Sequence, residues 1–264
     1  MGLEAGFDLV ELFWSAQGEG PHVGRSTLFL RFGGCNLRCA WCDTPGTWRP
    51  SKECRFEIAP GSGLFEKAVN PVPRHRLLEA MQALAPSPGG FLSLTGGEPL
   101  LQPAAVADAA EIGRNLGLQV SLETHGLAVE ALSQVIDSLD YVSMDWKLES
   151  DVSWANETPQ AKSEVKGFSG LHADFLSLIQ KRKVDSCVKV VITCDSSDEE
   201  LLEVCRVLAS TAPDVPLILQ PVTPYGRVQS QPSAEVLLGH LRRCSESLAD
   251  VRLIPQTHRV YGAR

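Results

Sequence analysis

Three cysteines lie within eight positions of one another near the start of the chain, in the pattern C-x3-C-x2-C at Cys35, Cys39 and Cys42. Three thiolates in one loop can bind three corners of a cubane 4Fe-4S cluster and leave the fourth iron open to a ligand from outside the protein. A site with four cysteines would be closed and suited to electron transfer alone. The count of three therefore predicts a 4Fe-4S centre with one reactive iron.

Structural zinc is the competing interpretation of these cysteines. Zinc prefers four nitrogen or sulfur ligands, which commonly come as two separated pairs. The chain has no second C-x2-C pair, and Cys54 is the only nearby candidate for a fourth ligand. The remaining cysteines are scattered, and a reducing compartment disfavours disulfides between them.

A second motif, Gly96-Gly97-Glu98-Pro99, follows a strand-like run at 91–95. Paired glycines let a backbone approach a ligand closely, because no Cβ stands in the way. Together with the cysteine triplet, this motif resembles the radical S-adenosylmethionine (SAM) superfamily. The resemblance implies that the amino and carboxylate groups of SAM bind the open iron and that one electron then cleaves SAM.

A closer resemblance extends over nearly the whole chain, to the family of 7-carboxy-7-deazaguanine synthases. The matching segments, in order, are 15–20, Gly24-Arg25, 29–35, 42–44, Thr95, 123–126, Ser143, Lys147, Gln220-Pro221 and 255–258. This resemblance implies a carbon-nitrogen lyase that converts 6-carboxy-5,6,7,8-tetrahydropterin to 7-carboxy-7-deazaguanine with release of ammonia, in queuosine and 7-deazapurine biosynthesis. It also implies Mg²⁺, a homodimer, and a flavodoxin-like or other one-electron donor.

The resemblance assigns roles to residues at matching positions. The predicted substrate-binding residues are Ala16, Gln17, Gly18, Glu19, Arg31, Thr95, Glu123 and His258, and the predicted SAM-binding residues are Gly97, Glu98, Ser143, Lys147 and Gln220. Thr44 matches the magnesium ligand of the family. The residue types suit a pterin, because Gln17 and Glu19 can pair with its aminopyrimidinone edge, and Arg31 can bind its carboxylate with two parallel hydrogen bonds.

Strand-like and helix-like segments alternate around these motifs. Strands are predicted at 26–32, 91–95, 118–122, 141–144, 188–193, 216–220 and 251–254, and helices at 73–84, 103–116, 128–139, 170–181, 197–210 and 233–247. Such alternation predicts an α/β fold with parallel strands. The resemblance specifies a partial radical SAM TIM barrel. We expect one domain over 1–264, with the cluster loop at 33–48 and loop insertions at about 48–72 and 149–167.

Composition and charge exclude several other classes. The formal net charge is −8, which argues against a nucleic-acid partner. No apolar run approaches the ~18 residues that a membrane span needs, and no secretory signal is visible, so we expect a cytoplasmic protein with a small-molecule substrate. Two alternatives stay open: a radical SAM activase that makes a glycyl radical on a partner protein, and a zinc-binding interaction module.

Overall fold

The computed structural model describes residues 6–155, 167–260 and 262–263, in which the strands form one large sheet and one small one. The strands are β1 (Leu9–Ala16), β2 (Ser26–Phe32), β3 (Leu37–Cys39), β4 (Glu53–Glu57), β5 (Phe65–Val69), β6 (Phe91–Gly96), β7 (Gln119–Thr124), β8 (Tyr141–Trp146), β9 (Val152–Trp154), β10 (Asp185–Ile192), β11 (Leu217–Pro221) and β12 (Val251–Leu253). The large sheet has the order β12-β11-β10-β8-β7-β6-β2-β1-β4-β5, and β3 pairs with β9.

The seven strands β12, β11, β10, β8, β7, β6 and β2 are each parallel to the next, whereas β1 runs antiparallel to β2. The sheet curves without closing, because the β12 and β5 edges do not pair with each other. The α/β fold class and the partial barrel with a parallel sheet are therefore confirmed. In parallel strands the carboxyl ends lie at one edge, where the connecting loops can meet.

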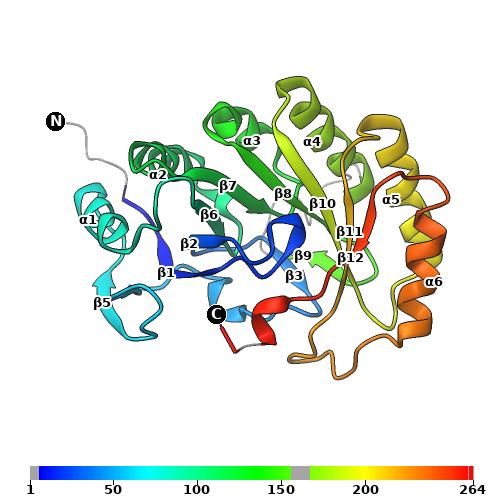
Figure 1. Ribbon diagram of the computed structural model, residues 1–264, viewed down its shortest axis with the longest axis horizontal. Coiled ribbons are helices and arrows are strands. Elements are labelled where there is room, and N and C mark those ends of the chain that lie inside the picture. Colours follow the sequence, from blue (N-terminus) through cyan, green and yellow to red (C-terminus); the bar gives the residue numbers. More distant parts are fainter. Residues whose placement is uncertain (1–5, 156–166, 261, 264) are drawn as a thin grey trace.

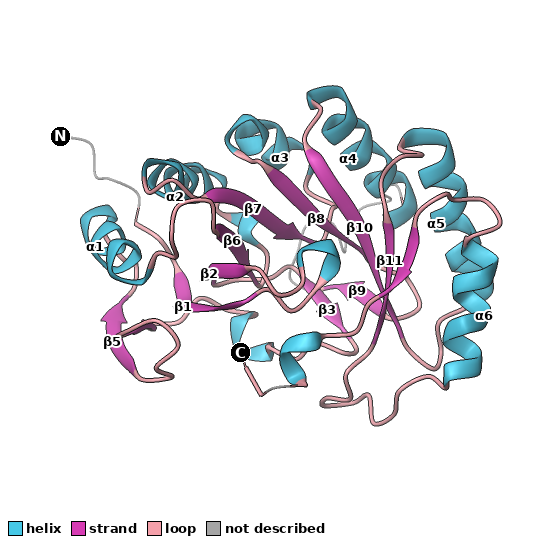
Figure 2. Ribbon diagram, viewed as in Figure 1, coloured by secondary structure: helices cyan, strands magenta, loops and turns pink. Residues whose placement is uncertain are grey.

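The parallel strands are connected through helices that cover the outer side of the sheet, as Figures 1 and 2 show. The helices are α1 (Arg74–Leu84), α2 (Pro103–Asn115), α3 (Val129–Val135), α4 (Phe168–Arg182), α5 (Asp198–Thr211) and α6 (Ala234–Cys244). In α5 the sequence explains the start of the helix, because the Ser197 hydroxyl accepts from the Glu200 N–H and three acidic residues occupy the first turn. Within the described ranges no helix is long and apolar enough to cross a membrane.

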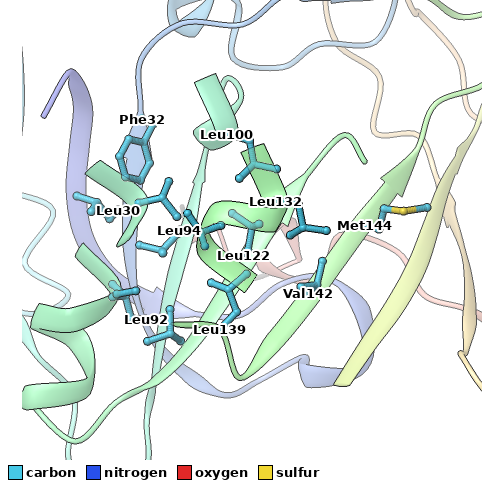
Figure 3. Close-up of a cluster of buried hydrophobic side chains, with 14 of the residues drawn as sticks. Leu30, Phe32, Leu92, Leu94, Leu100, Leu122, Leu132, Leu139, Val142 and Met144 are labelled. Atoms are coloured by element: carbon cyan, nitrogen blue, oxygen red, sulfur yellow. The ribbon is translucent and has the colours of Figure 1, made fainter. Parts of the chain in front are cut away.

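Side chains alternate between the two faces of the parallel strands. In β8, Val142, Met144 and Trp146 are buried in the main hydrophobic cluster, while Ser143 and Asp145 belong to the opposite face. Figure 3 shows Val142 and Met144 among the leucines of this cluster. Because successive strand residues point to opposite faces, one face packs on the helices and the other can carry polar groups.

The segment 48–72 differs from the prediction of a long loop. It contains β4 and β5, which form an antiparallel hairpin, and β4 pairs in parallel with β1. The segment is rich in proline, glycine and charged residues, so its local pattern does not predict a strand. The strand that β4 pairs with, β1, lies more than forty residues earlier in the chain. Of the predicted insertion 149–167, residues 152–154 form β9, and 156–166 lie outside the described residues.

Candidate active site

A cavity of about 480 Å³ opens on the inner side of the sheet. Its lining residues come from β1, β2, the loop between them, β4, the cluster loop, the carboxyl-terminal parts of the parallel strands, the segment 256–259 and Ala263. This volume is in the range of ordinary small-molecule sites, roughly 300–1,000 Å³. The inner face of the sheet therefore provides a pocket of the size that a small ligand needs.

All three cysteines of the C-x3-C-x2-C motif line this cavity. Cys54 does not join them, because it is buried in the hydrophobic core on β4. Burial raises the pKa of Cys35 to about 11 and that of Cys39 to about 12, so both stay thiols until a metal displaces the proton. Among the described residues, no three His, Cys, Asp or Glu side chains converge to hold a single metal ion.

The Gly-Gly-Glu-Pro turn packs against the cluster loop. A Cβ on Gly97 would stand 2.1 Å from the carbonyl oxygen of Gly34, so no other residue fits there. Glu98 is fully buried and does not line the cavity. Its carboxylate accepts from the Thr124 hydroxyl at 2.8 Å and from the His125 N–H at 2.9 Å, which ties the turn to the end of β7.

Glu123 is the centre of a hydrogen-bond network on the inner face. Its carboxylate accepts from Gln17 Nε2 at 2.9 Å, from Ser93 Oγ at 2.7 Å and from Thr95 Oγ1 at 3.0 Å. Gln17 Oε1 in turn accepts from the Glu19 N–H at 3.1 Å. These bonds hold the β1–β2 loop against β6 and β7, with the polar atoms of Gln17 and Glu123 at the cavity.

Glu19 is held by partners that are distant in sequence. Its carboxylate pairs with Lys189 of β10 and accepts from Gln256 Nε2 at 2.7 Å. Burial alone would raise the pKa of Glu19, but the charge of Lys189 and the hydrogen bonds from Gln256 and Lys189 lower it to about 2. Glu19 is therefore an anion at neutral pH, and both of its oxygens are fixed.

Arg31 lies with a second arginine in another part of the cavity wall. The carboxylate of Glu11, which is buried on β1, forms ion pairs with Arg31 Nε at 3.0 Å and with Arg55 Nη2 at 2.7 Å. Arg55 belongs to β4, the hairpin that was predicted as a loop. We call Arg31 and Arg55 the arginine pair. Together with Glu11, they form a cluster that carries one excess positive charge.

Three of the predicted SAM ligands lie on or directly after β8 or β11; two of them face the cavity and one does not. Lys147 and Gln220 line the cavity, and the buried Gln220 Oε1 has no hydrogen-bond partner. The Lys147 ammonium lies 4.5 Å from the ring centre of Trp41, which stands between two of the motif cysteines. Ser143 lies outside this cavity, with its hydroxyl 3.6 Å from Cys187 Sγ.

Residues 257–259 lie along one side of the cavity. Thr257 donates its N–H to the Gly18 carbonyl at 2.9 Å, and a Cβ on Gly18 would collide with the His258 ring. Arg259 pairs with Asp43 at 2.9 Å, next to Thr44, which also lines the cavity. Ala16 ends β1 and is not a lining residue.

The structure thus brings most of the predicted site residues to one cavity: Cys35, Cys39, Cys42, Thr44, Gln17, Gly18, Glu19, Arg31, Thr95, Glu123, His258, Gly97, Lys147 and Gln220. Ala16, Glu98 and Ser143 lie outside it. Sequence reasoning missed Glu11, Arg55, Asp145, Lys189 and Gln256, which also line it. A signal existed for Asp145 and Lys189, because each is a charged residue with an apolar residue on both sides of it in its strand.

The residues present fit a 4Fe-4S cluster and SAM. Three thiols without a fourth cysteine suit a cubane with one open iron. The buried Gln220 Oε1, which has no hydrogen-bond partner, can accept from a ligand, and SAM carries amino and hydroxyl donors. A zinc site fits less well, since zinc needs ligands that converge on one ion.

Comparisons with known proteins agree with this assignment. Residues 30–151 match the model of the radical SAM superfamily. The chain is 37% identical over 264 residues to 7-carboxy-7-deazaguanine synthase of Geobacter sulfurreducens, covering 97% of this chain and 98% of the relative. It is 32% identical to the protein of the same name from Thermococcus kodakarensis, covering 82% and 84%.

The fold is also found in solved structures. The crystal structure of QueE from Escherichia coli matches with a TM-score of 0.57 and 18% identity, covering 96% of this chain and 95% of that chain. A radical SAM methyltransferase from Sphaerobacter thermophilus matches with a TM-score of 0.56 and 14% identity, over 88% and 66%. At these identities the likeness shows the fold alone.

Proposed function

The chain belongs to the 7-carboxy-7-deazaguanine synthase family of the radical SAM superfamily, and we propose that it converts 6-carboxy-5,6,7,8-tetrahydropterin to 7-carboxy-7-deazaguanine with release of ammonia. The product serves queuosine and 7-deazapurine biosynthesis. One observation carries the proposal: a single cavity holds the three motif cysteines together with the polar groups of Gln17, Glu19 and Glu123. A glycyl-radical activase would have no evident use for such a polar set.

Cys35, Cys39 and Cys42 would hold the 4Fe-4S cluster, and Gly97, Lys147 and Gln220 would contact SAM. When bound, the cluster and SAM supply a one-electron route for removing a hydrogen atom from the substrate. Trp41 and Leu37 line the cavity beside these cysteines and would shield part of a bound cluster from water. Exclusion of water protects reactive species from side reactions.

The pterin ring would bind on the side of the cavity formed by the β1–β2 loop. Glu123 and Glu19 present acceptors to the amino and ring N–H groups of an aminopyrimidinone. The three donors that already hold Glu123 fix the direction of its carboxylate, which reduces the entropy lost on binding. The substrate carboxylate would bind the arginine pair, whose single excess positive charge complements it.

Thr44 would be the protein ligand of Mg²⁺. Magnesium keeps several waters and substrate oxygens, so one hydroxyl from the protein is compatible with its octahedral shell. Thr44 lines the cavity beside Asp43, which Arg259 holds in an ion pair. The metal would then orient the substrate against the cluster side of the cavity.

The remaining features follow the family. The protein would act as a homodimer in the cytoplasm, with one radical SAM domain per chain, and would receive electrons from a flavodoxin-like or other one-electron donor. Its partners would be the pterin and this donor, and neither a nucleic acid nor a membrane.

The test is anaerobic reconstitution of the protein with iron and sulfide, followed by incubation with SAM, dithionite, Mg²⁺ and 6-carboxy-5,6,7,8-tetrahydropterin. We expect 7-carboxy-7-deazaguanine and ammonia in equal amounts. Stoichiometric zinc without iron or sulfide in anaerobically purified protein, or deoxyadenosine formation with no deazaguanine from this pterin, would contradict the proposal.

A further inference from the structure

Asp145 and Lys189 are two charged residues of the cavity wall to which the family resemblance assigns no role. They lie directly opposite each other in the register of the neighbouring parallel strands β8 and β10. Their side chains are 23% and 8% exposed. Burying a charge costs several kcal/mol unless a partner compensates it, so charges at these depths call for an explanation.

The two residues are the middle of a chain of four alternating charges. Glu19 pairs with Lys189, Lys189 Nζ lies 3.3 Å from Asp145 Oδ1, and Asp145 Oδ2 lies 3.1 Å from Lys147 Nζ. We call these four residues the charge chain. Burial by itself would lower the pKa of Lys189, but the charges of Asp145 and Glu19 raise it well above its ordinary value, so Lys189 keeps its proton between them.

The two ends of the charge chain point to different predicted ligands. Glu19, at one end, is a predicted contact of the pterin. Lys147, at the other end, is a predicted contact of SAM and lies over Trp41, beside the motif cysteines. All four charged residues line the same cavity. Asp145 and Lys189 therefore lie between the two predicted subsites.

We infer that Asp145 and Lys189 are positioning residues that hold Glu19 and Lys147 at a fixed separation and thereby join the pterin subsite to the SAM subsite. The inference rests on the proposed function. Without Lys189, Glu19 loses the cation that fixes one of its oxygens. Without the Asp145 charge, the ammonium groups of Lys147 and Lys189 lose the carboxylate that both contact, and Lys147 is no longer held in place.

A purely structural ion-pair network is the alternative, and it makes a different prediction. Replacing one member of a buried pair lowers stability in either case, because the other charge is left uncompensated. Only a positioning role makes a change at one end weaken the ligand at the other end. Energetic coupling of this kind between two sites typically amounts to about 5- to 150-fold in affinity.

The experiment measures equilibrium affinities of cluster-loaded protein for SAM and for the pterin, each without the other ligand. We expect Lys189→Met to weaken pterin binding by about tenfold and SAM binding by about threefold, and Asp145→Asn to give the reverse order. Lys189→Arg, which keeps the charge, should recover most of the affinity. Lys67→Met, which removes an exposed lysine paired with Glu53, is the control and should change neither affinity.

A second measurement confirms the contact without any ligand. In a double-mutant cycle on metal-free protein, the unfolding free energies of Glu19→Gln, Lys189→Met and the double variant should be non-additive, because the double variant leaves no unpaired charge. If Lys189→Met and Asp145→Asn lower the unfolding free energy but leave both affinities within twofold of the parent protein, the charge chain is structural only and the inference is overturned.

Failure of the proposed function gives a different result. If the parent protein binds SAM but makes no deazaguanine from the pterin, the assigned substrate is wrong. The inference is then decided by SAM affinity alone. Lys189→Met must weaken SAM binding, although Lys189 is connected to Lys147 only through Asp145. Unchanged SAM affinity in that variant would overturn it.

Discussion

The arginine pair and the charge chain are both ion-pair clusters in the cavity wall, yet they differ in balance and burial. In the arginine pair, two guanidinium groups share Glu11, and Arg55 is 44% exposed. In the charge chain, two anions and two cations cancel, and no side chain is more than 23% exposed. An uncompensated, accessible charge is suited to bind an incoming anion, whereas a balanced buried network is suited to hold a geometry.

The largest effect is expected at the motif cysteine Cys39, which lines the same cavity as both clusters. Cys39→Ala should abolish product formation, because two thiolates cannot retain the cubane with one defined open iron. Iron and sulfide content, together with product assays under anaerobic conditions, measure this change. Cys194→Ala, at an exposed cysteine outside the motif, is the matched control and should behave as the parent protein does. Full activity of Cys39→Ala would show that the motif is not the cluster site.

Arg31→Ala tests the binding role of the arginine pair. We expect KM for the pterin to rise roughly 10- to 100-fold, since a hydrogen bond to a charged group contributes about 1.5–3 kcal/mol. The cluster absorption spectrum should be unchanged, because Arg31 contacts Glu11 rather than a cysteine. Loss of the spectrum in this variant would assign Arg31 to support of the cluster.

Acid titration tests the balance of the charge chain. The pKa of Glu19 is lowered from 4.5 to about 2, so the ion pair adds stability above pH 4.5 that is lost as the pH falls toward 2. Glu19→Gln should therefore flatten the loss of unfolding free energy across this window by on the order of 3 kcal/mol. Chemical denaturation of metal-free protein at several pH values measures it. Parallel pH profiles would contradict the ionic state assigned to Glu19.

Arg55→Gln should give the smallest effect. Arg55 is more exposed than Arg31, and an exposed charge is screened by water and salt. We expect KM for the pterin to rise about two- to fivefold at low salt, and the difference from the parent protein to shrink at high salt. Arg76→Gln, at a surface arginine paired with Glu66, is the control. An effect as large as that of Arg31→Ala would show that the two arginines bind the carboxylate equally.

The sequence by itself determined the fold class, most of the parallel strands and the cofactor-binding motifs. These features are local: hydrophobic runs of β-forming residues predict strands, as at 26–32, which β2 matches residue for residue. The cysteine triplet and the Gly-Gly-Glu-Pro turn are each contained in a few consecutive residues. Spacing alone therefore sufficed to find them.

Only the tertiary structure decided which charges meet. Arg55 reaches the cavity because β4 pairs with β1, and Lys189 meets Glu19 across 170 positions of sequence. The fold also buries Glu98 away from the cavity, and it places Ser143 in a second, smaller pocket. Such partnerships depend on strand order and on which face of the sheet a side chain occupies. Strand order is a non-local property, so no short window of sequence contains it.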